Sequence, residues 1–192
     1  MADVAPLTPT PAFSASPAPL VVVMGVSGCG KSTVGGLLAE RLGATFLEGD
    51  SLHPPRNIER MAAGVALTDA DRCDWLLAIA ARLADARAAG CPFVVSCSAL
   101  KRSYRELLRG PSSDLAFVHL SGTPALLTER MHSRPGHYMP TSLLASQFAT
   151  LEAPAADERS VTFDTALPAE QIADRAAAWL VDLPIAATQP SP

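Results

Sequence analysis

Short apolar runs alternate with amphipathic segments along most of this chain. The runs are rich in β-branched and aromatic residues, which predicts strands over residues 20–24, 44–48, 93–97, 115–120 and 161–163. Apolar residues at helical spacing predict helices over residues 33–42, 68–86, 101–109, 124–134, 142–151 and 169–180, and another that starts at residue 54. Alternating strands and helices predict an α/β fold, a five-stranded parallel sheet with helices on both faces.

The segment that begins at Thr68 has a well-defined helical pattern. The sequence Thr68-Asp69-Ala70-Asp71 is typical of a capping box, in which the first and last of these residues satisfy each other's backbone N–H groups. One helical face then carries an apolar stripe made of Trp75, Leu76, Ile79, Leu83 and Ala86. We expect this stripe, Trp75 included, to pack in the core.

The two ends of the chain differ from the rest in composition. Residues 1–18 and 184–192 are rich in Pro, Ala, Ser and Thr, which predicts disordered tails around one domain at residues 19–183. No basic segment precedes the first apolar run, and no run approaches the roughly 18 residues of a membrane span. We therefore expect neither a signal peptide nor a membrane anchor.

Charge and cysteine content narrow the classes of partner and the compartment. The net charge is −4, which gives no electrostatic basis for binding nucleic acid or an anionic membrane. Cys29, Cys73, Cys91 and Cys97 show neither a C-x-x-C pair nor a zinc-binding spacing. Thiols of this kind are typical of a reducing compartment, so we expect a cytoplasmic protein.

A glycine-rich motif follows the first predicted strand and opens the first predicted helix. The residues Gly25, Val26, Ser27, Gly28, Cys29, Gly30, Lys31 and Ser32 fit the pattern G-x-x-x-x-G-K-[ST]. Its glycines allow backbone N–H groups to turn around phosphate oxygens, and the helix N-terminus favours an anion. Lys31 can reach the β- and γ-phosphates and Ser32 can bind Mg²⁺, so the motif predicts a protein that binds ATP with Mg²⁺.

Polar residues follow the other predicted strands at the same edge of the sheet. Asp50, Ser98 and Lys101 come after the second and third strands, where parallel α/β sheets bind their ligands. The third strand ends without an acidic residue, so Glu48 and Asp50 are the candidates for metal contact and for orienting an acceptor hydroxyl. Asp50 as a helix cap and Glu48 as a solvated strand end are the alternatives.

The chain resembles gluconokinases of the small P-loop type, which are related to shikimate and nucleoside-monophosphate kinases. The resemblance covers residues 20–182. The motifs that carry it are the glycine loop, Gly49-Asp50 with Leu52-His53-Pro54 and Asn57, Asp71-Arg72 with Trp75-Leu76, Cys97-Ser98-Ala99-Leu100-Lys101 with Tyr104-Arg105, Arg134 with Gly136-His137, and Gln147-Phe148 with Leu151-Glu152 and Pro154. The resemblance implies a nucleoside-monophosphate-kinase-like fold with a small helical lid at about residues 130–150.

The resemblance also implies a role for individual residues. It implies catalytic roles for Lys31, Asp50 and Arg134, a nucleotide contact from Arg130 besides the loop, and a metal site at Ser32 and Glu48. The implied substrate contacts are His53, Arg56, Asn57, Arg60, Ser98, Lys101, Arg105 and His137. This mixture suits a sugar acid, because a carboxylate prefers forked cationic donors and hydroxyls prefer short polar groups.

The implied activity is ATP-dependent phosphorylation of D-gluconate on its 6-hydroxyl. Two alternatives stay open: a kinase for shikimate or a nucleoside monophosphate, and a nucleotide-binding regulator without turnover. Arg130 and Arg134 are four residues apart, so a solvated pair on one helix face is the alternative to a role in the lid. The expected partners are small molecules, with no nucleic acid and no membrane, and the resemblance favours a homodimer.

Overall fold

The computed structural model describes residues 17–110, 112–132 and 141–183, and it gives no description of the side chains of residues 141 and 142. A five-stranded parallel sheet with the order β2-β3-β1-β4-β5 lies at its centre, which confirms the predicted fold class. The strands are β1 (Leu20–Met24), β2 (Thr45–Glu48), β3 (Phe93–Ser96), β4 (Ala116–Ser121) and β5 (Ser160–Asp164).

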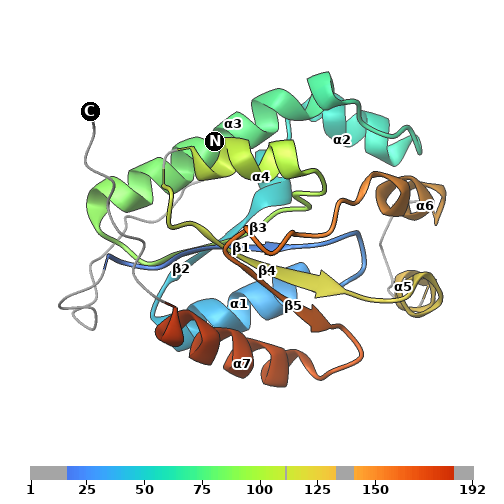
Figure 1. Ribbon diagram of the computed structural model, residues 1–192. Helices are drawn as coiled ribbons and strands as arrows, with labels where there is room; N and C mark the ends of the chain where they lie inside the picture. Colours follow the sequence, from blue (N-terminus) through green and yellow to red (C-terminus); the bar gives the residue numbers. More distant parts are fainter. Residues whose placement is uncertain (1–16, 111, 133–140, 184–192) are drawn as a thin grey trace.

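Helices cover both faces of the sheet. They are α1 (Lys31–Leu42), the 3-10 helix η1 (Gly49–Leu52), α2 (Pro55–Ala62), α3 (Asp69–Ala89), α4 (Arg102–Arg109), α5 (Pro124–His132), α6 (Thr141–Thr150) and α7 (Ala169–Asp182). Helices α1 and α7 cover one face, and α3 and α4 cover the other (Figure 1). The predicted tails lie outside the described residues, apart from residues 17 and 18.

The core consists of two apolar layers that share the sheet. Val21 and Val23 face the layer of α1 and α7, whereas Leu20, Val22 and Met24 face the layer of α3 and α4. Every residue of β1 is buried, which explains its unbroken apolar sequence, because a central parallel strand is covered on both sides. The predicted stripe of α3 is buried in the second layer, so the prediction of a core face is confirmed.

Local sequence signals set the ends of the long helices. The Thr68 hydroxyl accepts from the Asp71 N–H and the Asp71 carboxylate accepts from the Thr68 N–H, which confirms the predicted capping box. Gly43 and Gly90 follow α1 and α3 in the left-handed conformation, with φ of 59° and 63°. Glycine adopts this conformation without the steric cost of a Cβ, so both helices end where the sequence places a glycine.

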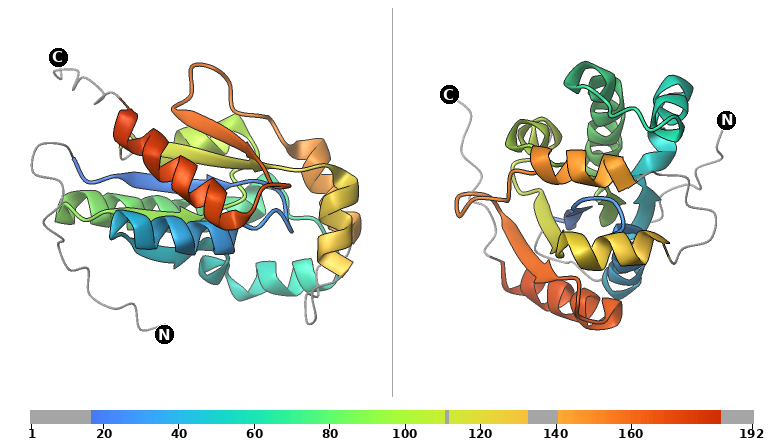
Figure 2. Two further views of the ribbon diagram at one scale, coloured as in Figure 1. Left: turned by 90° about the horizontal axis from the view of Figure 1, so that it is seen from below. Right: turned by 90° about the vertical axis from the view of Figure 1, so that its right-hand side faces the viewer.

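The carboxyl edge of the sheet is where η1, α2, α5 and α6 gather (Figures 1 and 2). Helices α5 and α6 contact each other, and Leu127, Met131 and Leu144 pack into the layer of α1 and α7. Helix α6 and the last three residues of α5 fall within the segment predicted as a lid, while residues 133–140 lie outside the described residues. Both helices have a packed, apolar side, and a role as a lid stays a prediction.

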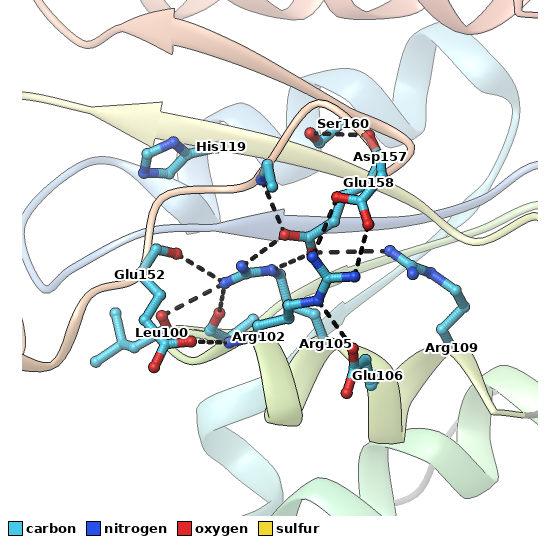
Figure 3. A network of polar contacts seen from close by, with 12 residues as sticks. Leu100, Arg102, Arg105, Glu106, Arg109, His119, Glu152, Asp157, Glu158 and Ser160 are labelled. Atoms are coloured by element: carbon cyan, nitrogen blue, oxygen red, sulfur yellow. Dashed lines mark hydrogen bonds and ion pairs between the residues drawn. The ribbon is translucent and has the colours of Figure 1, made fainter.

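A buried ion pair ties the loop after β3 to the segment after α6 (Figure 3). Arg105 is fully buried and donates from Nε and Nη2 to the two carboxylate oxygens of Glu158, at 2.6 and 2.8 Å. Its Nη1 donates to the carbonyls of Ala99 at 3.1 Å and Glu152 at 2.9 Å. Hydrogen bonds from Arg105 lower the pKa of Glu158, so this carboxylate is charged in the folded protein.

This network corrects one prediction from the sequence. Arg105 was expected to bind the substrate, but its guanidinium lies in the interior, bonded to Glu158 and to backbone carbonyls. It holds Ala99, a non-glycine residue with a positive φ of 43°, in the loop that carries Ser98. Arg105 therefore shapes the wall of the site without entering it.

We expect Arg105→Met to destabilise the fold by about 3–5 kcal/mol, because it removes two hydrogen bonds from the buried Glu158 carboxylate and leaves Arg109, with its Nη2 3.7 Å away, as the nearby cation. Denaturant unfolding near pH 7 measures this loss. The folded-state pKa of Glu158 is depressed, so its share of wild-type stability is present above the ordinary carboxyl pKa and disappears as the pH falls through the folded-state value. The double variant Arg105→Met, Glu158→Leu should recover part of the loss. Equal stability of Arg105→Met and wild type would contradict the role of this pair.

Candidate functional site

The glycine loop joins β1 to α1 through a backbone that side chains would obstruct. Gly25, Gly28 and Gly30 have positive φ values of 139°, 79° and 94°. A Cβ on Gly25 would lie 2.6 Å from the carbonyl oxygen of Leu120, and one on Gly28 would lie 2.9 Å from the Met131 side chain. No side chain caps the N-terminus of α1, so its first N–H groups remain available to an anion.

Lys31 and Ser32 are the first two residues of α1. The Lys31 ammonium donates to the carbonyl of Val26 at 3.0 Å, so the side chain folds back over the loop. Ser32 is exposed. Cys29 is buried under the loop, and burial raises the pKa of its thiol. The Lys31 ammonium and the Ser32 hydroxyl thus lie at the loop, while the thiol of Cys29 stays neutral.

One pocket, which we name the acceptor pocket, lies beside Lys31 at the carboxyl edge of the sheet. Its polar lining comes from the glycine loop, η1, α3, the loop after β3 and α6, and includes Ser27, Lys31, Asp50, His53, Arg72, Ser98, Ser146 and Gln147. Met61, Leu67, Trp75 and Leu143 contribute apolar surface. The structure therefore brings together five of the residues that the sequence predicted, namely Ser27, Lys31, Asp50, His53 and Ser98.

A close backbone approach fixes the position of Asp50. A Cβ on Gly49 would overlap the carbonyl oxygen of Ser96, so only glycine fits there. The Gly49 N–H donates to the Ser96 hydroxyl at 3.1 Å, and the Gly49 carbonyl accepts from the indole N–H of Trp75 at 2.7 Å. Asp50 follows directly, with an exposed carboxylate in the acceptor pocket.

His53 lies across the pocket from Asp50. Its Nε2 is 3.9 Å from an oxygen of Asp50, and its ring stacks on Trp75 with centroids 4.1 Å apart and planes 16° from parallel. Burial lowers the pKa of His53, the charge of Arg72 lowers it further, and Asp50 opposes both. The imidazole is therefore neutral at pH 7.

A second pocket, the nucleotide-side pocket, lies on the other side of the glycine loop. Gly28, Gly30 and Thr33 line it together with Arg130 and the segment 165–169. Arg130 donates from Nη2 to the carbonyl of Thr165 at 2.7 Å, which holds its guanidinium beside the loop. The structure thus brings Arg130 to the phosphate loop, where the sequence predicted a nucleotide contact.

Several other predicted residues do not line the acceptor pocket. Arg56 pairs with Asp74 at 2.6 Å, Arg60 lies 3.6 Å from Asp71, and Lys101 donates to both oxygens of Asp69 at 2.8 and 2.7 Å. Each of these cations lies near an acidic residue of α3, so its substrate contact stays a prediction.

Two more predicted residues, Asn57 and Glu48, also do not line the acceptor pocket. Asn57 is fully buried behind His53, so it cannot touch a substrate. Glu48 accepts from the hydroxyl of Ser96, beside the acceptor pocket. Arg134 and His137 fall outside the described residues.

Residues that the sequence reasoning missed complete the acceptor pocket. Arg72 brings a guanidinium into it, and the Gln147 amide oxygen accepts from the Ser27 N–H at 2.6 Å, joining α6 to the glycine loop. Trp75 is buried as predicted, but it also forms a wall of the pocket. The motifs Asp71-Arg72 and Gln147-Phe148 were visible in the sequence, although nothing in their spacing shows that these side chains meet.

A glycine loop that opens the first helix of a parallel sheet defines a P-loop protein, and the two pockets beside the loop suit the phosphate donor and the acceptor of a kinase. A family model described as an AAA domain matches residues 20–154. Within the described residues no helix is long and apolar enough to cross a membrane, and no cluster of three or more His, Cys, Asp or Glu is arranged to hold a metal.

Known proteins narrow this class to one family. Gluconokinase from Gluconobacter oxydans is 54% identical over 138 residues, which cover 72% of this chain and 78% of that protein. Thermoresistant gluconokinase from Escherichia coli is 44% identical over 142 residues, 74% of this chain and 81% of that protein. The crystal structure of a gluconokinase from Sinorhizobium meliloti is 52% identical with a TM-score of 0.79, covering 87% of this chain and 94% of that chain. The chain belongs to the gluconokinase family.

We expect Lys31→Ala to reduce kcat by roughly 10²–10³-fold, because it removes the charge nearest the transferring phosphoryl group. A coupled assay of ADP release measures kcat, and circular dichroism checks that the variant is folded. Arg175→Ala is the matched control, since Arg175 is exposed on α7 and lines neither pocket. Wild-type turnover of folded Lys31→Ala would contradict the assignment of the loop.

Proposed function

We propose that this protein transfers the γ-phosphate of ATP to the 6-hydroxyl of D-gluconate and releases 6-phospho-D-gluconate and ADP. The observation that carries the proposal is that Lys31 of the phosphate loop and the Asp50 carboxylate line one pocket, in a chain of the gluconokinase family. A phosphate-binding cation and an acceptor-facing carboxylate are the two groups that phosphoryl transfer to an alcohol needs side by side.

The nucleotide phosphates bind the N–H groups of the glycine loop and the N-terminus of α1. Lys31 exchanges the carbonyl of Val26 for phosphate oxygens when ATP binds, because an ammonium interacts more strongly with an anion than with a neutral carbonyl. The nucleoside lies in the nucleotide-side pocket, next to Arg130. This arrangement directs the γ-phosphate toward the acceptor pocket.

Asp50 orients the acceptor hydroxyl and takes its proton. As the bond from the hydroxyl oxygen to the γ-phosphorus forms, the bond from that phosphorus to the bridging oxygen of ADP breaks. The hydroxyl proton passes to the Asp50 carboxylate late in transfer. Lys31 balances the negative charge that moves onto the bridging oxygen.

The residues at the loop fit Mg²⁺. This ion binds one or two protein oxygens together with nucleotide phosphates and water, so it needs no cluster of protein ligands. Ser32 has an exposed hydroxyl at the loop and Glu48 lies at the end of β2, and these residues would hold the ion. When bound, Mg²⁺ neutralises charge on the phosphates.

The acceptor pocket suits a sugar acid. Arg72 supplies a forked cation for its carboxylate, while His53, Ser98 and Gln147 supply neutral groups for hydroxyls.

A homodimer and a cytoplasmic location are also part of the proposal. The homodimer rests on the family resemblance, and the location rests on the cysteine pattern.

A substrate screen tests the proposal. ADP release is measured with D-gluconate, shikimate, AMP and no acceptor. We expect turnover with D-gluconate alone, because only this acceptor combines one carboxylate with an open chain of hydroxyls that ends in a primary alcohol. Preferred turnover of shikimate or AMP would assign a related kinase, and no turnover with any acceptor would favour a nucleotide-binding regulator.

We expect Asp50→Asn to lower kcat by roughly 10²–10⁴-fold, because an amide keeps the size of the side chain but loses its charge and basicity. The dissociation constant of an ATP analogue and the melting temperature should change little, since the phosphate loop is untouched and Asn caps a helix as well as Asp. Asp85→Asn, at an exposed position of α3 outside both pockets, is the control. A near-normal kcat for Asp50→Asn would leave this residue as a cap only.

A further inference from the structure

We propose that Asn57 is a positioning residue that holds His53 in the neutral tautomer with its hydrogen on Nε2, so that His53 always donates to the reacting hydroxyl of the substrate. This inference rests on the proposed function for the identity of the substrate. The tautomer itself does not depend on that identity.

The orientation of the Asn57 amide is set by a backbone carbonyl. Asn57 is fully buried, and its Nδ2 donates to the carbonyl oxygen of Asp71 at 2.7 Å. A carbonyl only accepts hydrogen bonds, so the opposite orientation of the amide would bring two oxygens together. The amide nitrogen therefore lies on the side of α3.

The same nitrogen lies 3.4 Å from Nδ1 of His53. An amide nitrogen carries two hydrogens and has no lone pair to accept with, and one of its hydrogens is already directed at Asp71. The second hydrogen is the one available for the contact with Nδ1, so in that contact Nδ1 accepts and is the unprotonated ring nitrogen. In a neutral imidazole this leaves the hydrogen on Nε2.

Two further contacts keep the ring in this orientation. The imidazole stacks on Trp75, whose indole is itself fixed by its hydrogen bond to the Gly49 carbonyl. His53 is only 8% exposed, so the ring has little room to turn over. Nε2 then faces the acceptor pocket and the carboxylate of Asp50.

The gap between His53 and Asp50 has the chemistry of an alcohol site. The 3.9 Å between Nε2 and the Asp50 oxygen is too long for a direct hydrogen bond, but an oxygen beside both can bond to each. That oxygen must accept from Nε2 and donate to the carboxylate, and a hydroxyl does both. A carboxylate or a phosphate oxygen cannot donate, so this pair selects the alcohol end of the substrate.

The charges around His53 agree with a neutral donor. Asp50 faces it from η1, Arg72 from α3, and Lys31 lines the same pocket from the glycine loop. Burial and Arg72 outweigh Asp50 and lower the pKa of His53. The ring thus donates without carrying a charge that would compete with Lys31 for the phosphoryl group.

Nuclear magnetic resonance of the folded full-length protein tests the tautomer directly. Long-range ¹H–¹⁵N spectra distinguish a protonated Nε2 from a protonated Nδ1, and a His53→Gln sample assigns the signals among the four histidines. We expect wild-type His53 to be protonated on Nε2, and Asn57→Leu to give a mixture of both tautomers. Buried His119, which is paired with Thr162, is the internal reference and should not change. A wild-type His53 protonated on Nδ1 would overturn the proposal even if Asn57→Leu did not fold.

Kinetics then test whether Asn57 acts through His53. We expect Asn57→Leu to lower kcat/KM for D-gluconate roughly 10- to 100-fold, the effect of misaligning one hydrogen bond to the reacting group, and to leave KM for ATP unchanged. In the His53→Gln background the same change should have no further effect. If Asn57→Leu lowered kcat/KM in the His53→Gln background as much as it does in the wild type, Asn57 would have a structural role and the proposal would be overturned. Absence of gluconate turnover in wild type would refute the proposed function but not the tautomer.

Discussion

The tight turn of the backbone between β1 and α1 is the constraint on which both pockets depend. Three glycines with positive φ allow the chain to pass between the carbonyl of Leu120 and the side chain of Met131. A Cβ on Gly25 would meet the Leu120 carbonyl and one on Gly28 would meet the Met131 side chain, so no side chain can be added at either position without moving a neighbour. Ser27 and Lys31 line the acceptor pocket while Gly28 and Gly30 line the nucleotide-side pocket, so one short loop borders both pockets.

The elements of this fold could be predicted from the sequence because their causes are local. The apolar run of β1, the capping box at Thr68 and the glycine after α1 each act within a few residues. The predicted ends of the strands and helices agree with the structure to within one or two residues in most cases. The convergence of Asp50 and Ser98 beside the glycine loop also followed, since parallel strands present their carboxyl ends at one edge.

The composition of the acceptor pocket could not be predicted in the same way, because it depends on distant partners. The sequence predicts a substrate contact for Arg105, but this residue is buried in an ion pair with Glu158, 53 residues away. Asn57 was assigned to the substrate and instead lies behind His53, bonded to a carbonyl of α3. Gln147 reaches the site from α6, 120 residues beyond the Ser27 N–H that it accepts from. Residue type and spacing do not reveal which of two polar groups is paired and which faces the ligand.

Hydrogen bonds fix α6 at its C-terminal end and join it to the glycine loop. Just beyond its C-terminal end, the Glu152 N–H donates to the Leu100 carbonyl and the Glu152 carboxylate accepts from the Arg102 N–H, beside the buried pair of Arg105 and Glu158. The contact of Gln147 with the glycine loop lies before this fixed end. Leu143, Ser146 and Gln147 of α6 line the acceptor pocket, and Gln147 also accepts from the Ser27 N–H. The position of this one helix therefore sets both a wall of the acceptor pocket and a hydrogen bond to the glycine loop.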